Sequence, residues 1–144
     1  MQNPVRNVLA LVAGVLVGGL VNTALITLSP SLIPPPAGVD VNNVESMSKA
    51  MHLFEPRHFV MPFLAHAAGT FAGALVAFLT AATYKVQIGY AIGAVFLCGG
   101  IAASLMLPAP AWFIAVDLVA AYLPMAWLAI RVGTRLGAAR RPQV

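Results

Sequence analysis

The chain has 144 residues, of which 60% are hydrophobic and 8% are charged, and its formal net charge is +4. A typical soluble domain has about 25% charged residues. A soluble chain of this length could not bury so much apolar surface. Its cations stand beside the ends of apolar runs without forming a basic face, which argues against nucleic-acid binding. The composition therefore predicts an all-α integral membrane protein with a single membrane domain over residues 1–144.

A helix that crosses the hydrocarbon core of a bilayer needs about 20 consecutive, mostly apolar residues. Four stretches of the chain meet this requirement, and they cover residues 5–28, 59–82, 86–107 and 111–132. Prolines mark the expected ends of the first and third stretches, at Pro30 and Pro108. We expect an up-down bundle of four transmembrane helices, with an outer loop over 29–58 and a cytoplasmic tail over 133–144.

The cations near the apolar stretches predict the orientation of the chain. Six of them fall at the amino terminus, in the second connection and in the tail: Arg6, Lys85, Arg131, Arg135, Arg140 and Arg141. Only Lys49 and Arg57 fall in the remaining connections. Because cytoplasmic segments carry the excess of Lys and Arg, this distribution predicts a multi-pass protein of the inner (plasma) membrane with both termini in the cytoplasm.

Small residues indicate how the helices pack together. Burial alone does not drive helix association in lipid, whereas close approach of backbones through small residues does. Glycines four residues apart occur in three of the stretches: Gly14 and Gly18, Gly69 and Gly73, and Gly89 and Gly93. They predict a tight bundle, either within one chain or between copies. In the fourth stretch, Pro124 frees the carbonyl of Ala120, which predicts a kink in mid-membrane.

The outer loop is expected to contain one short helix. Its first part, PSLIPPPAGVD, is rich in proline and should be extended. The following segment, NNVESMSKAMHLFEP, has a helix cap at Asn42 or Asn43 and apolar residues at helical spacing, and Pro56 ends it. A short helix with one apolar face is expected on the outer surface of the bundle or in the headgroup region.

The same segment contains weak candidates for metal ligands. His52, Glu55 and His58 have spacings of three, and two imidazoles with a carboxylate suit zinc or another divalent ion. Pro56 interrupts the helix between Glu55 and His58, however, and these side chains are also ordinary neighbours of lipid headgroups. Metal binding is therefore unknown from the sequence, and we expect no cofactor.

A small polar set lies within the apolar stretches. Asn22, His66 and Asp117 fall in one layer of the outer half of the bilayer, and Thr70 and Tyr122 complete a candidate ligand or proton site. An unpaired carboxylate facing lipid costs about 2.5–3.5 kcal/mol. We therefore expect Asp117 to face the bundle and to bond to His66, Asn22 or amides of the outer loop.

Several functions stay open, and the favoured hypothesis is an accessory or scaffolding protein of the inner membrane in which polar contacts hold the helices together. The alternative is a small oligomeric proton- or cation-coupled transporter or channel that uses Asp117 and His66. A bound lipid, quinone or haem on His66, and a metal-dependent membrane enzyme, are further alternatives. No nucleophile or phosphate-binding motif is present, so an enzyme is not expected and no catalytic residue is assigned. The expected partners are the bilayer and a second copy or a larger membrane protein.

Overall fold

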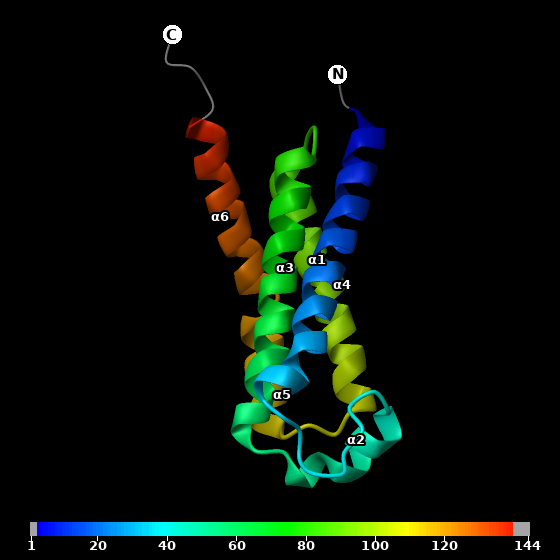
Figure 1. The fold of residues 1–144 in the computed structure, drawn as a ribbon. Helices are drawn as coiled ribbons and strands as arrows, with labels where there is room; N and C mark the ends of the chain where they lie inside the picture. The colour runs from blue at the N-terminus through cyan, green and yellow to red at the C-terminus, as the bar shows by residue number, and fades with distance from the viewer. Residues whose placement is uncertain (1–2, 140–144) are drawn as a thin grey trace.

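The computed structural model describes residues 3–139, and this part of the chain is helical without strands. Three long helices are continuous, and they are α1 (Pro4–Leu32), α3 (Val60–Thr80) and α4 (Lys85–Met106). The fourth is divided into α5 (Ala111–Ala120) and α6 (Leu123–Ala139). The long helices alternate in direction, so that α1 begins and α6 ends at one end of the bundle, here called the termini end (Figure 1).

The opposite end, here called the loop end, carries the short elements that join α1 to α3 (Figure 1). They are the helix α2 (Val44–Ala50) and the 3-10 turns η1 (Met51–Leu53) and η2 (Pro56–Phe59). Asn43 caps α2, because its Oδ1 accepts the N–H of Ser46 at 2.9 Å. The short helix expected in the outer loop is therefore present, and it lies across the loop end of the bundle.

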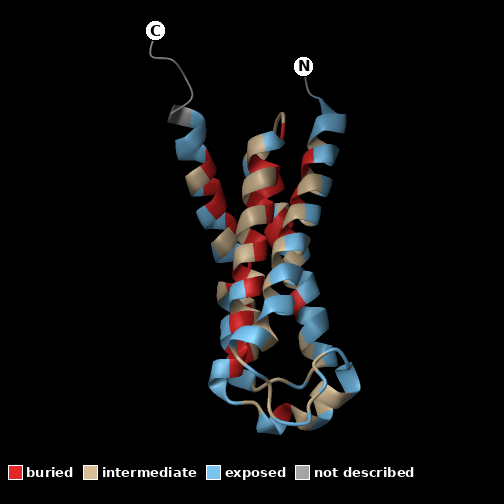
Figure 2. Ribbon diagram, in the orientation of Figure 1, coloured by how far each residue is buried: buried red, intermediate tan, exposed pale blue. Residues whose placement is uncertain are grey.

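The long helices have the surface of a multi-pass membrane protein. Four helical segments are long and apolar enough to cross a membrane, with mean hydropathies between 1.6 and 2.2. Buried residues follow the seams between helices, whereas the outward faces are exposed along their length (Figure 2). Those faces carry large apolar side chains such as Leu9, Leu16 and Leu105. The predicted all-helical fold with four apolar helices is confirmed.

Two predicted boundaries are wrong. The first helix does not stop at residue 28 but continues through Pro30 to Leu32, and the N–H of Ile33 still bonds to the Ser29 carbonyl at 2.8 Å. The fourth helix does not stop at residue 132 but continues to Ala139. The kink predicted at Pro124 is present as an interruption of this helix at residues 121–122. The physical reason is the position of Pro124 in the first turn of α6, where its missing N–H would have no helical partner in any case. Arg140 and Arg141, which the predicted orientation used, lie outside the described residues.

The helix α3 forms the centre of the bundle and contacts α1, α4, α5 and α6. Its seam with α1 consists of four glycines whose backbones touch. A Cβ atom on Gly14 would lie 2.7 Å from the Gly73 carbonyl oxygen, and one on Gly18 would lie 2.7 Å from that of Gly69. The absence of side chains at these positions therefore sets the distance between the two helices.

A second seam joins α4 to α6. Here the atoms nearest to the glycines belong to side chains of α6. A Cβ atom on Gly89 would lie 2.8 Å from Cγ1 of Ile130, and one on Gly93 would lie 2.8 Å from Cβ of Ala126. Ile88, Ile92 and small residues of α3 and α6 complete this core.

At the termini end, α1 is fastened to the connection between α3 and α4. Asn7 accepts the backbone N–H groups of Ala82 and Thr83 at 3.0 and 3.1 Å, and its amide donates to the Thr83 hydroxyl at 2.8 Å. Arg6 Nε donates to the Thr80 carbonyl at 2.8 Å, at the end of α3. These bonds satisfy backbone groups that the helix end leaves free, and no local sequence pattern indicated them.

The packing of the α1–α3 seam predicts that two glycine substitutions differ strongly in their effect on the free energy of unfolding. Gly73→Ala places a Cβ atom 2.6 Å from the Gly14 carbonyl oxygen, so α1 and α3 must separate. We expect a loss of about 1–3 kcal/mol in the free energy of unfolding, as for other overpacked cores. Thermal unfolding in detergent, followed by circular dichroism, measures it. Gly19→Ala on α1 is the matched control, because nothing lies within 4 Å of its added Cβ. Equal stability of the two variants would contradict this packing.

Candidate functional site

A buried carboxylate organises the polar side chains inside the bundle. Asp117 lies on α5 and is 4% exposed. Its Oδ1 and Oδ2 atoms lie 2.8 and 3.0 Å from Nδ1 of His66 on α3. The hydroxyl of Tyr122 donates to Oδ2 at 2.8 Å. Both carboxylate oxygens therefore have hydrogen-bond donors, which is the condition for keeping such a group away from water.

The break in the fourth helix is what brings Tyr122 to Asp117. In a continuous helix, residues five apart point in directions about 140° apart and do not meet. Here α5 ends at Ala120, and Tyr122 lies in the break, so its side chain turns back toward the carboxylate. A Cβ atom on Gly100 of α4 would lie 2.5 Å from Cζ of Tyr122, so the glycine leaves the space that the phenol ring occupies.

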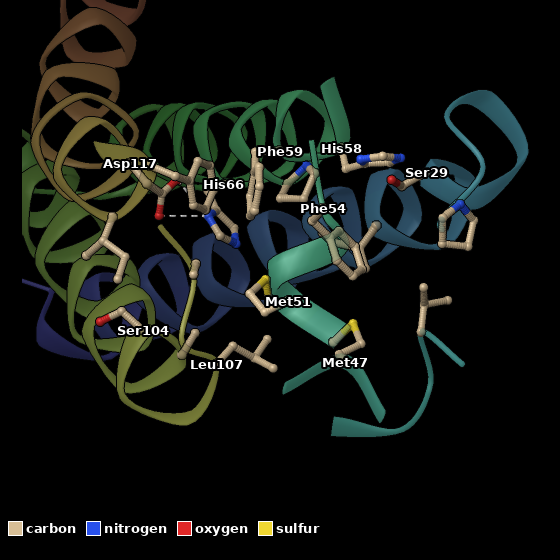
Figure 3. A pocket seen from close by; sticks show the side chains of 18 of the residues that line it. Ser29, Met47, Met51, Phe54, His58, Phe59, His66, Ser104, Leu107 and Asp117 are labelled. Carbon is tan, nitrogen blue, oxygen red and sulfur yellow. Dashed lines mark hydrogen bonds and ion pairs between the residues drawn. The ribbon is translucent and has the colours of Figure 1, made fainter. Parts of the chain in front are cut away.

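The imidazole of His66 is held on one edge and on one face. Its Nδ1 faces the carboxylate, and its ring stacks on that of Tyr122 with centroids 5.8 Å apart and planes 27° apart. Because a carboxylate accepts hydrogen bonds, Nδ1 carries the proton. No described residue bonds to Nε2, and Figure 3 shows the ring edge opposite Asp117 turned toward the pocket.

That pocket is a cavity of about 580 Å³ at the loop end of the bundle (Figure 3). Its walls come from the end of α1, the start of α3, the end of α4 and the start of α5, and the outer-loop elements α2 and η1 cover it. Apolar side chains dominate the lining, among them Met47, Met51, Phe54, Phe59, Leu107 and Phe113. His66 and Asp117 also line it, and the His66 side chain is 22% exposed against 6% for Asp117. The histidine is therefore the accessible member of the pair.

The structure brings together three of the five predicted site residues, and they are His66, Asp117 and Tyr122. Thr70 lies one turn from His66, but its hydroxyl donates to the His66 carbonyl at 2.8 Å and not to the carboxylate. Asn22 is apart from the cluster. It packs at Gly69 on the seam between α1 and α3, and its Oδ1 is buried without a hydrogen-bond partner.

The candidate metal ligands of the outer loop do not gather. His58 uses both ring nitrogens, since Nδ1 accepts the Glu55 N–H at 2.9 Å and Nε2 donates to the Pro34 carbonyl at 3.1 Å. Glu55 pairs with Arg57 at 3.0 Å, and His52 is exposed. Within residues 3–139, no group of three or more histidine, cysteine or acidic side chains is placed to hold a metal ion. His58 instead ties the proline-rich segment to the start of α3.

Sequence reasoning missed the cavity and the role of Gly100. Gly100 was visible only as the second residue of a Gly-Gly pair, and nothing local indicated that a tyrosine ring would fill its place. The cavity depends on how the outer loop folds back over the helices, which helical periodicity does not specify.

The Tyr122 bond to Asp117 predicts a measurable loss of stability. Tyr122→Phe removes the hydroxyl and leaves the ring, so we expect the free energy of unfolding in detergent to fall by about 1 kcal/mol, the scale of hydrogen bonds between membrane helices. Tyr90→Phe on the exposed face of α4 is the matched control and should change nothing. If both variants unfold like the parent protein, the bond contributes no stability.

No known protein-family model, curated protein or solved structure matches this chain. The assignment to multi-pass membrane proteins is carried by the four long apolar helices. Any function has to be argued from the His66–Asp117–Tyr122 cluster and the cavity above it.

Proposed function

We propose that this chain is a small accessory membrane protein that holds an amphipathic molecule in the cavity at its loop end. The observation that carries the proposal is a largely apolar cavity of about 580 Å³ with His66 and Asp117 in its wall. Binding sites for small molecules are typically about 300–1,000 Å³, mostly apolar, with a few polar groups that fix orientation. The apolar part of the ligand fills the space among the methionines and phenylalanines, and its polar part meets His66.

The proposal includes the orientation expected from the sequence, with the loop end outside an inner membrane. At the termini end, Arg6, Lys85, Arg131 and Arg135 lie on helices whose first and last turns hold no acid. The two cations of the loop end are instead neutralised by neighbours: Lys49 pairs with Glu45 at 2.6 Å, and Arg57 pairs with Glu55 at 3.0 Å. This asymmetry supports cytoplasmic termini, and the ligand then enters from the outer leaflet.

The helix break beside Asp117 favours one second candidate, which is proton- or cation-coupled transport. Pro124 has no N–H for the Ala120 carbonyl, and the break begins four residues after the buried carboxylate. Broken helices with free backbone groups near the middle of the membrane form ion sites in secondary transporters. In that case the ligand of the cavity is the transported solute.

A cavity-filling variant tests the binding proposal. Ala103 lines the cavity on α4, so Ala103→Trp should occupy it. We expect native mass spectrometry of protein extracted from its membrane to find a bound amphipathic molecule on the parent protein and to lose it with this variant. Ala102→Trp is the matched control, because Ala102 is exposed and does not line the cavity. The proposal is contradicted if the parent protein carries no small molecule. It is also contradicted if Ala103→Trp retains as much of the bound molecule as the parent protein does.

Flux measurements separate transport from binding alone. If the second candidate holds, the reconstituted protein acidifies or alkalinises vesicles that contain a pH-sensitive dye, and Asp117→Asn abolishes this flux. Asp40→Asn in the exposed outer loop is the matched control and should leave the flux intact. A parent protein that moves no protons or alkali cations removes transport and leaves the accessory binding role.

A further inference from the structure

We infer that the molecule in the cavity is uncharged and carries a carbonyl or hydroxyl group, which forms a hydrogen bond with Nε2 of His66. This inference rests on the proposed function and narrows the chemical class of its ligand. Quinones, quinols and long-chain alcohols belong to this class, whereas phospholipid headgroups, fatty-acid anions and quaternary amines do not.

The charge of the cavity wall disfavours an anionic ligand. No lysine, arginine or glutamate is among the residues that line it. Lys49 and Glu45 pair with each other away from it, and Arg57 and Glu55 line a separate hollow beside the proline-rich segment. A protonated His66 would be balanced by Asp117, so the wall offers an anionic ligand no net positive charge in exchange for its lost water, which is costly in apolar surroundings.

A cationic ligand fits no better. The one acidic side chain in the wall is Asp117, and its two oxygens already receive bonds from His66 and Tyr122. The carboxylate is also nearly inaccessible behind the imidazole, with its side chain 6% exposed. A cation could reach it only by displacing His66, which would break the contact that holds the histidine in place.

Most polar side chains around the Asp117 side of the cavity already have hydrogen-bond partners. The Ser104 hydroxyl donates to the Ile101 carbonyl at 2.7 Å, and the Tyr122 hydroxyl donates to Asp117. Both nitrogens of His58 are occupied by Glu55 and Pro34. Nε2 of His66 has no partner among the described residues, and its edge of the ring faces the cavity (Figure 3). It is the unpaired polar side-chain atom on the α3 and α5 side of the cavity, whereas the other free polar side chains of the lining, those of Thr27, Ser29 and Asn42, lie on α1 and in the outer loop.

The chemistry of Nε2 suits both a hydroxyl and a carbonyl group. With Nδ1 bonded to Asp117, Nε2 accepts a hydrogen bond from a hydroxyl when the ring is neutral and donates one to a carbonyl when the ring is protonated. One fixed ring therefore serves both groups. Asp117 and Tyr122 act as positioning residues, because they hold the imidazole without touching the ligand. The flexible Met47 and Met51 side chains adapt the remaining space to an apolar tail.

Tryptophan fluorescence gives a direct readout of binding. The chain has two tryptophans, so Trp127→Phe leaves Trp112 as the reporter. The ring centroid of Trp112 lies 5.7 Å from that of Phe59 and 5.9 Å from that of Phe113, and both phenylalanines line the cavity. The full chain with this reporter is placed in phosphatidylcholine nanodiscs and titrated with four probes that share a ten-carbon tail: a decyl-substituted benzoquinone, 1-decanol, decanoate and decyltrimethylammonium.

The expected result is saturable binding of the quinone and of decanol, with decanoate and decyltrimethylammonium failing to saturate. His66→Asn should weaken the two neutral probes about tenfold, since a lost hydrogen bond of about 1.4 kcal/mol changes a dissociation constant by that factor. The asparagine amide still reaches Asp117 from the position of Nδ1, so the variant stays folded, and its circular dichroism is measured alongside. His52→Asn outside the cavity is the matched control and should leave binding unchanged.

The outcomes separate this inference from the proposed function. Tighter binding of decanoate or decyltrimethylammonium than of the neutral probes overturns the inference and leaves a cavity for amphipathic molecules. Neutral probes that bind equally to the parent and to His66→Asn overturn the assigned contact. Saturable binding of none of the four overturns the inference. The proposed function is tested separately: it is supported if a molecule co-purifies with the parent protein and is lost with Ala103→Trp, and it is contradicted otherwise.

Discussion

The requirement that a carboxylate within apolar surroundings be hydrogen-bonded on both oxygens explains most features of the site. Asp117 meets this requirement through His66 on α3 and through Tyr122 after the end of α5. His66 belongs to α3 and Asp117 to α5, so their contact also fixes how these two helices are rotated about their axes. The polar contact therefore has a structural role whatever the cavity binds, since breaking it would leave an unsatisfied charge between helices.

The helix break and Gly100 make the contact between Tyr122 and Asp117 possible. A continuous fourth helix would turn Tyr122 away from the carboxylate, and a side chain at position 100 would occupy the space of the phenol ring. With Nδ1 and one ring face of His66 occupied, the remaining nitrogen is directed to the cavity. The bonds that bury Asp117 thus also orient the accessible edge of the imidazole, which is the group that we propose to bind the ligand.

The glycine seam between α1 and α3 supplies the rigid frame around the site. Backbone contact through Gly14, Gly18, Gly69 and Gly73 places α1 at a fixed distance from the helix that carries His66. The end of α1 then forms one wall of the cavity, and its connection to α3 folds back as the cover. Rigid walls under an adaptable cover of methionines are the arrangement expected of a site that accepts an apolar tail and orients one polar group.

Local properties of the sequence determined the helical class, the number of long apolar helices and a cap of α2 at Asn42 or Asn43, of which the structure uses Asn43. Hydropathy, the period of 3.6 residues and the capping chemistry of asparagine act within single segments of the chain. Tertiary structure alone decided that Asn22 packs at Gly69 without joining the cluster, and that the outer loop covers a cavity. These features depend on the rotation of each helix about its axis and on contacts between segments far apart in the chain, which no single segment encodes.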